Sequence, residues 1–198
     1  MADAAAAVAP RPSAGHVAER PQLLAVGVVI WLGSEFMFFS GLFAAFFTIR
    51  ASAPHWPLPG TKLDTIQAGV FTFVLLVSSP TMQLGVWAQE KGQFRKARAW
   101  IVTSFLLGAA FLANQGYEWK TVPGRPHTNA YWSLFYIMSG LHGLHVLLGL
   151  VAMLALLGRL AGKKGDPGET AVFQAVSYYW HFVDIIWIGL FSALFLLS

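Results

Sequence analysis

The sequence predicts an all-α membrane bundle of five transmembrane helices. Hydrophobic residues make up 56% of its 198 residues and charged residues only 11%, about half the charged fraction usual for soluble domains. Five apolar stretches approach or exceed the roughly 20 residues that a helix needs to cross a membrane. They lie at about residues 22–50, 65–89, 97–118, 131–158 and 171–197. We therefore expect one transmembrane domain over residues 22–198, preceded by a mobile tail over residues 1–21.

Each stretch has a composition that suits the membrane interior. Apart from its terminal arginine, the first stretch carries a single charge, Glu35, and the second carries none. The third is the tightest fit, because its uncharged part, residues 99–117, leaves little room for tilt. The fourth contains no carboxylate, lysine or arginine, and the fifth is interrupted by His181 and Asp184.

The segments outside these stretches are short and polar. Prolines and a glycine break residues 51–63, basic residues fill 90–98, and residues 120–130 and 158–170 form two further loops. The N-terminal residues are rich in alanine and proline and too polar to span a membrane. The apolar run that follows is longer than that of a signal peptide, so we expect the first helix to be retained. The sequence shows no internal repeat, which gives no support to an inverted-repeat transporter.

The distribution of basic residues predicts an orientation. With the N-terminus inside, nine of them fall on the inner side: Arg11, Arg20, Lys91, Arg95, Lys96, Arg98, Arg159, Lys163 and Lys164. Four fall outside: Arg50, Lys62, Lys120 and Arg125. This excess predicts an inner N-terminus and an outer C-terminus. The basic residues, with a net charge of +4, are therefore expected to orient helices and meet anionic lipid, not to bind nucleic acid.

The sequence has no cysteine. Disulfides, zinc-thiolate sites, iron–sulfur clusters and a thiol-bound copper centre are therefore excluded from this chain.

Ionisable residues inside the predicted spans are the candidate functional residues. Each costs roughly 3 kcal/mol at the membrane centre, so Glu35, Glu118 and Asp184 must be neutral, paired or near an interface. Position along the spans places Glu35 and Asp184 near mid-membrane and Glu118 near the outer surface.

Helical spacing indicates which groups share a face. Ser177, His181 and Asp184 lie on one face of the fifth span, and His142 and His145 share a face of the fourth. We expect these two faces to lie opposite each other. On the third span, a polar stripe of small residues suits contact with another helix; it consists of Ser104, Gly108, Gln115 and Glu118.

Three interpretations of these residues remain open. A buried hydrogen-bond network could hold the helices in register, because imidazoles and carboxylates can satisfy one another. A metal or haem site could use the histidines with Asp184 and Glu118, although no i, i+4 histidine pair or ExxH spacing occurs. A proton relay, as in a small proton or solute transporter, could start from Glu35.

Four blocks of the sequence resemble the third subunit of haem-copper terminal oxidases, with cytochrome c oxidase subunit III as the nearest likeness. They are SEFMFFSGLFAAFF at 34–47, QGYEW at 115–119, SGLHGLHVLLGL at 139–150 and YYWHFVDIIWIGLF at 178–191. The blocks occur in family order and the likeness extends from about Leu23 to the C-terminus.

The resemblance implies an accessory subunit of a proton-translocating oxidoreductase in the bacterial plasma membrane. It implies no catalytic residue, metal or redox centre in this chain, with haem and copper held by partner subunits I and II. It also implies contact with phospholipid, support of proton uptake, and protection of the enzyme during oxygen reduction. The partners could extend to a larger respiratory supercomplex.

The resemblance also assigns the site residues. Glu35 corresponds to the family's carbodiimide-reactive intramembrane glutamate. An internal polar network, with a structural or proton role, is implied for Glu118, His142, His145, His181 and Asp184.

The chain departs from the family in one respect. Many members have seven helices, and this chain begins where their third would. In those members the first two helices form one wall of a lipid-binding cleft, so the resemblance does not imply the same cleft here. Five-helix forms also occur in related quinol oxidases, which leaves a quinol donor as an alternative to cytochrome c.

Overall fold

The computed structural model describes residues 23–56, 63–162 and 167–197. The tail expected over residues 1–21 lies outside the described residues, as do residues 57–62 of the predicted loop at 51–63. The elements, in chain order, are α1 (Leu23–Ser52), α2 (Thr65–Glu90), α3 (Phe94–Thr121), α4 (Ala130–Gly162), α5 (Pro167–Phe191) and a closing π-helical turn (Ser192–Leu196).

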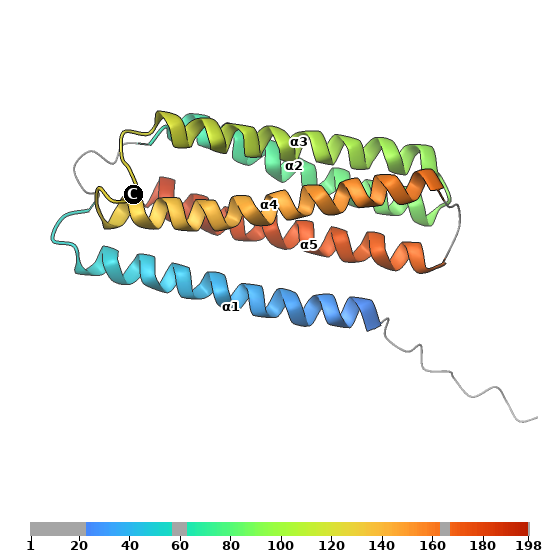
Figure 1. The fold of residues 1–198 in the computed structure, drawn as a ribbon, viewed down its shortest axis with the longest axis horizontal. Helices are drawn as coiled ribbons and strands as arrows, with labels where there is room; N and C mark the ends of the chain where they lie inside the picture. Colours follow the sequence, from blue (N-terminus) through green and yellow to red (C-terminus); the bar gives the residue numbers. More distant parts are fainter. Residues whose placement is uncertain (1–22, 57–62, 163–166, 198) are drawn as a thin grey trace, which may run out of the picture.

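The five helices lie side by side, and successive helices run in opposite directions (Figure 1). All five are long and apolar enough to cross a membrane, which confirms the predicted all-α fold and makes the chain a multi-pass membrane protein. α5 is central, because it packs against α1, α2 and α4. α2 and α3 form a closely packed pair, whereas α1 lies apart from that pair and packs mainly on α5 (Figure 1).

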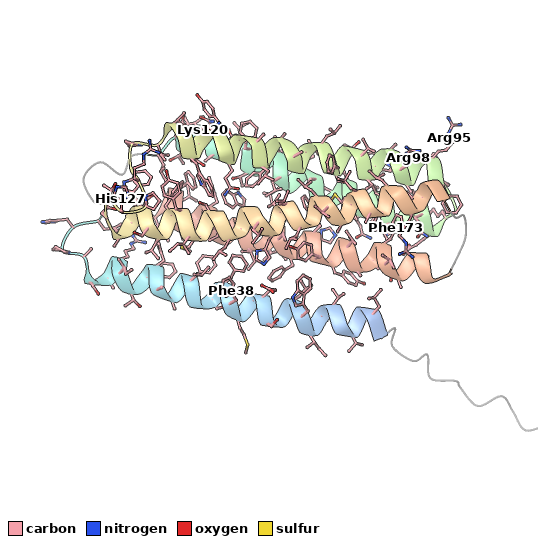
Figure 2. The ribbon with its side chains drawn as sticks, viewed as in Figure 1. Phe38, Arg95, Arg98, Lys120, His127 and Phe173 are labelled. Carbon is pink, nitrogen blue, oxygen red and sulfur yellow. The ribbon has the colours of Figure 1, made fainter. Side chains whose placement is uncertain are left out.

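The third helix is longer than the sequence predicts. We expected a span at 97–118 after a basic loop, but α3 begins at Phe94 and ends at Thr121. Arginine and lysine are good helix formers whose long side chains reach back to water, so they extend the helix beyond the apolar core. Arg95 and Arg98 gather at one end of the bundle and Lys120 at the opposite end (Figure 2).

A tight turn joins α2 to α3. Gly92 has a φ of 68°, in the left-handed region where glycine carries no steric penalty. The backbone N–H of Gly92 donates to the carbonyl of Gln89 at 2.9 Å, and that of Gln93 donates to Ala88 at 2.8 Å. These bonds satisfy carbonyls at the end of α2 and reverse the chain within three residues.

The centre of the bundle is built around Trp180 of α5, which is fully buried. Its indole ring lies where α3 and α4 both carry a glycine, Gly108 and Gly149. The indole Nε1 donates to the Ser78 hydroxyl of α2 at 2.8 Å. One side chain therefore joins α5 to three neighbouring helices.

Candidate functional site

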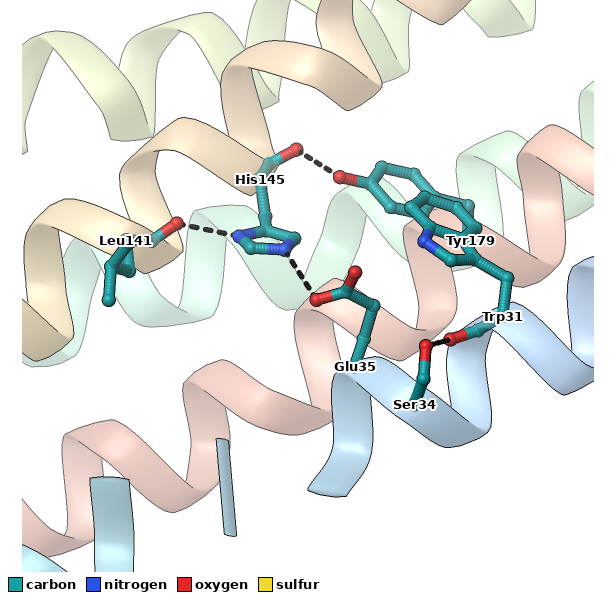
Figure 3. Close-up of polar contacts among 6 residues, drawn as sticks. All are labelled: Trp31, Ser34, Glu35, Leu141, His145 and Tyr179. Carbon is teal, nitrogen blue, oxygen red and sulfur yellow. Dashed lines mark hydrogen bonds and ion pairs between the residues drawn. The ribbon is translucent and has the colours of Figure 1, made fainter. Parts of the chain in front are cut away.

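The first polar cluster joins α1, α4 and α5 at mid-helix, and Figure 3 shows its contacts. His145 of α4 places Nε2 3.2 Å from Oε2 of Glu35 on α1. Its other ring nitrogen, Nδ1, lies 2.7 Å from the carbonyl oxygen of Leu141. The side chains of His145 and Glu35 are only 11% and 22% exposed.

The partners of His145 define where its protons lie. A carbonyl oxygen only accepts, so Nδ1 carries a proton and donates it to Leu141. A neutral imidazole then has only a lone pair at Nε2, yet Nε2 faces a carboxyl oxygen of Glu35. The contact requires one more proton, held either by Glu35 as a carboxylic acid or by His145 as an imidazolium. In either form the pair has no net charge, which suits its position inside the membrane.

Aromatic residues enclose this pair. Tyr179 of α5 donates its hydroxyl to the backbone carbonyl of His145 at 2.8 Å, and Trp31 of α1 stacks on the Tyr179 ring with centroids 5.3 Å apart. Phe39 packs edge-on against the His145 ring at 5.1 Å. These contacts hold α1 against α4 and α5.

The second polar cluster lies between α2 and α5. His181 Nδ1 is 2.6 Å from the Ser79 hydroxyl, and its Nε2 is 3.3 Å from Oε1 of Gln83. Ser177 Oγ lies 3.1 Å from the same Nε2, so the predicted shared face of Ser177 and His181 is confirmed.

Asp184 lies one turn beyond His181 and is almost fully buried. Neither of its carboxyl oxygens has a hydrogen-bond partner among residues 23–56, 63–162 and 167–197. The sequence left open whether His181 and Asp184 pair, and in the described structure they do not.

His142 occupies a third position, in the aromatic core. Its ring stacks on Trp187 at 4.7 Å and meets the edge of Phe111 at 6.0 Å. Both ring nitrogens are buried without a partner in the described part of the chain. The predicted faces of α4 and α5 do lie opposite each other. Trp187 and Tyr179 of α5 make the contacts between them, whereas the His181 side chain faces α2.

Glu118 lies away from these clusters, near the end of α3. It is half-buried and lines a hollow with Gln67 of α2 and with Asp64, which precedes that helix. On the same stripe, the Gln115 amide donates to the carbonyl of Ser139 on α4, and Ser104 meets the Thr81 hydroxyl of α2 at 2.7 Å. The predicted stripe on α3 therefore contacts both neighbouring helices.

The six predicted site residues thus fall into separate groups. Glu35 pairs with His145, His181 joins α2 with Asp184 one turn beyond it, and His142 and Glu118 lie apart. Sequence reasoning missed Ser79, Gln83, Tyr179 and Trp31, which supply most of the partners. Ser79 and Gln83 are four residues apart on α2, a spacing that places both on one helix face. In the part of the chain that the structure describes, no group of three or more His, Asp or Glu side chains is placed to hold a metal.

Comparison with known proteins places this architecture in a family. The family model described as Cytochrome c oxidase subunit III matches residues 13–198. The chain is 44% identical over 184 residues to a probable cytochrome c oxidase subunit 3 of Mycobacterium tuberculosis, covering 91% of both chains. It is 46% identical over 184 residues to the corresponding protein of Nocardia farcinica, again covering 91% of both.

A third relative, the cytochrome c oxidase subunit 3 of Corynebacterium diphtheriae, is 40% identical over 185 residues and covers 90% of each chain. These matches confirm the resemblance seen in the four sequence blocks. The chain belongs to the cytochrome c oxidase subunit III family.

Proposed function

We propose that the chain is an accessory subunit of an aerobic cytochrome c oxidase in the plasma membrane of a bacterium. It carries no redox centre of its own and packs on subunit I, and its partner subunits I and II hold haem and copper. The observation that carries the proposal is the likeness to proteins named cytochrome c oxidase subunit 3 along about nine-tenths of the chain. Those names favour cytochrome c over quinol as the electron donor, and the positive-inside pattern favours an inner N-terminus.

Contact with phospholipid is supported by the surface of α1. Ile30 and Met37 leave 70% and 76% of their surface exposed. Such large apolar exposure suits lipid chains or an apolar partner. Beside it, a hollow of about 340 Å³ opens between α1, α4 and α5. Its lining is almost entirely apolar and includes Leu24, Val28, Trp31, Leu148, Val172 and Val176.

Support of proton uptake is proposed for the pair of Glu35 and His145. The two side chains share one proton at mid-membrane, so the pair can exchange that proton between carboxyl and imidazole without a change in net charge. A site of this kind can hold a proton beside a neighbouring catalytic subunit, while electron transfer takes place within that subunit.

Purification of the complex tests the accessory role. An affinity tag on this chain, in gently solubilised membranes, should recover haem together with oxygen reduction driven by reduced cytochrome c. Complexes that lack the chain should retain haem but lose activity progressively during turnover. Recovery of the tagged chain without haem would refute the assignment, and activity with quinol but not with cytochrome c would move it to a quinol oxidase.

A further inference from the structure

A row of polar side chains, interrupted once, follows the contact between α2 and α5. It begins at the exposed end of α2, where the Gln174 amide donates to Glu90 at 2.9 Å. One turn further along α5, Ser177 donates to Gln83 at 3.2 Å. His181 and Ser79 continue the row, which ends at Asp184. We call these residues the α2–α5 polar seam.

The seam reaches from one membrane surface to the middle of the bundle. Ser79 lies eleven residues before Glu90 on α2, a rise of about 16 Å along a helix. That is about half of a hydrocarbon core roughly 30 Å thick. Ser79, Gln83 and His181 are only half-buried, so the seam is not sealed inside the core.

The hydrogen bonds fix the direction of donation along the seam. Gln83 Oε1 can only accept, so His181 carries its proton on Nε2 and donates it there. Nδ1 of His181 then accepts, and Ser79 donates its single proton to it at 2.6 Å. Ser79, which contacts His181 one turn before Asp184 on the same face of α5, has no second proton to donate and can only accept from the Asp184 carboxyl group.

Asp184 can therefore bond to Ser79 only in its protonated form. Both of its oxygens are buried and lack a partner in the described structure, and an unpaired charged carboxylate at this depth costs several kcal/mol. Buried polar groups that lack protein partners are commonly satisfied by ordered water. The one-turn gap between Gln174 and Ser177 has polar groups on both sides that can hold such water.

Other titratable groups around α5 do not compensate Asp184. His142 of α4 packs on Trp187, Glu35 and His145 pair with each other, and Glu90 lies at the far end of the seam. In the described ranges none of them forms a hydrogen bond or ion pair with Asp184.

From this arrangement we infer that the α2–α5 polar seam binds ordered water and connects a protonated Asp184 to the aqueous phase at the Glu90 end. The exchange is balanced. A proton leaves the Asp184 carboxyl for Ser79 Oγ, directly or through one water, while the Ser79 proton passes to His181 Nδ1. The Nε2 proton of His181 leaves to water beside Gln83, and one proton re-enters by the reverse steps.

Infrared spectroscopy of the purified oxidase that contains this chain tests the inference. The wild type should show the carbonyl stretch of a protonated carboxylic acid that disappears in Asp184→Asn and shifts after transfer to D₂O. Ser79→Ala and Gln83→Leu should slow the shift in D₂O at least about fivefold, the change in rate that corresponds to the free energy of one hydrogen bond. Ser40→Ala is the matched control, because the Ser40 hydroxyl donates to the carbonyl of Phe36 on its own helix.

Three results would overturn the inference. An identical carboxylic band in Asp184→Asn would mean that Asp184 is ionised. A wild-type band that D₂O never shifts would mean that no water reaches it. Equal exchange rates in the wild type, Ser79→Ala and Gln83→Leu would exclude the seam as the route. If Asp184→Asn does not assemble, Asp184→Glu should displace the band, and an undisplaced band overturns the assignment.

Discussion

The close approach of Trp180 to two glycines predicts that alanine at either position loosens the bundle. A Cβ atom at Gly108 would lie 2.7 Å from Cη2 of the indole, and one at Gly149 would lie 2.6 Å from Cε3 and Cζ3. Carbon atoms at van der Waals contact lie about 3.5 to 4 Å apart, so each substitution creates an overlap of about 1 Å. We expect Gly108→Ala and Gly149→Ala to destabilise the chain.

The magnitude follows from how little Trp180 can move. It is fully buried, and its Nε1 donates to Ser78 at 2.8 Å, so displacement breaks that bond or shifts a helix. Overpacking of a filled core costs about 1 to 3 kcal/mol. For a chain of this size, each kcal/mol lowers the midpoint of unfolding by about 2 to 4 °C.

Gly116 provides a matched control on the same helix as Gly108. No atom lies within 4 Å of a Cβ built there, and glycine inside a helix is about 0.5 to 1 kcal/mol less favourable than alanine. Gly116→Ala should therefore leave stability unchanged or raise it. The assay is the midpoint of thermal unfolding of the chain in the solubilised complex, and equal midpoints for Gly108→Ala, Gly149→Ala and Gly116→Ala would refute the reasoning.

Two further predictions concern contacts between helices. Glu35→Leu should destabilise the chain by about 1 to 3 kcal/mol in thermal unfolding, because it leaves Nε2 of buried His145 unpaired; Glu35→Gln can still donate to that nitrogen and should stay close to the wild type. Thr81→Val and Ser104→Ala should show a coupling energy of about 0.6 kcal/mol in a double-mutant cycle of thermal stability, the mean for hydrogen bonds between membrane helices, whereas exact additivity would mean that the 2.7 Å contact does not form.

The sequence predicted the five spans well because each helix must satisfy its own backbone inside a membrane, which makes long apolar runs diagnostic. It also predicted helix faces, because spacing along one helix is fixed geometry. The contact between Ser177 and His181 at 3.1 Å is a case of this kind. The ends of α3 were harder to predict, because basic residues beside an apolar stretch can either continue its helix or form a loop.

The partners across helices could not be predicted, because spacing fixes the face of a residue but not which helix lies opposite. Nothing in the sequence indicates that the partner of Glu35 is His145, which lies 110 residues further along the chain. Likewise, the pattern that aligned His181 with Asp184 gave no sign that Ser79 would lie between α2 and α5.

The positions of the glycines suggest how the bundle selects its helix partners. Hydrophobic burial alone cannot select partners in lipid, because the lipid chains are as apolar as the side chains, so shape and a few polar contacts must do so. The Trp180 indole fits only where α3 and α4 both carry a glycine and α2 presents a hydroxyl. Rotation of α3 by one residue would bring the side chain of Leu107 or Ala109 towards the indole in place of Gly108. The indole therefore fixes the rotation of α3 and α4 about their axes, and with it the side of α4 on which His145 faces Glu35.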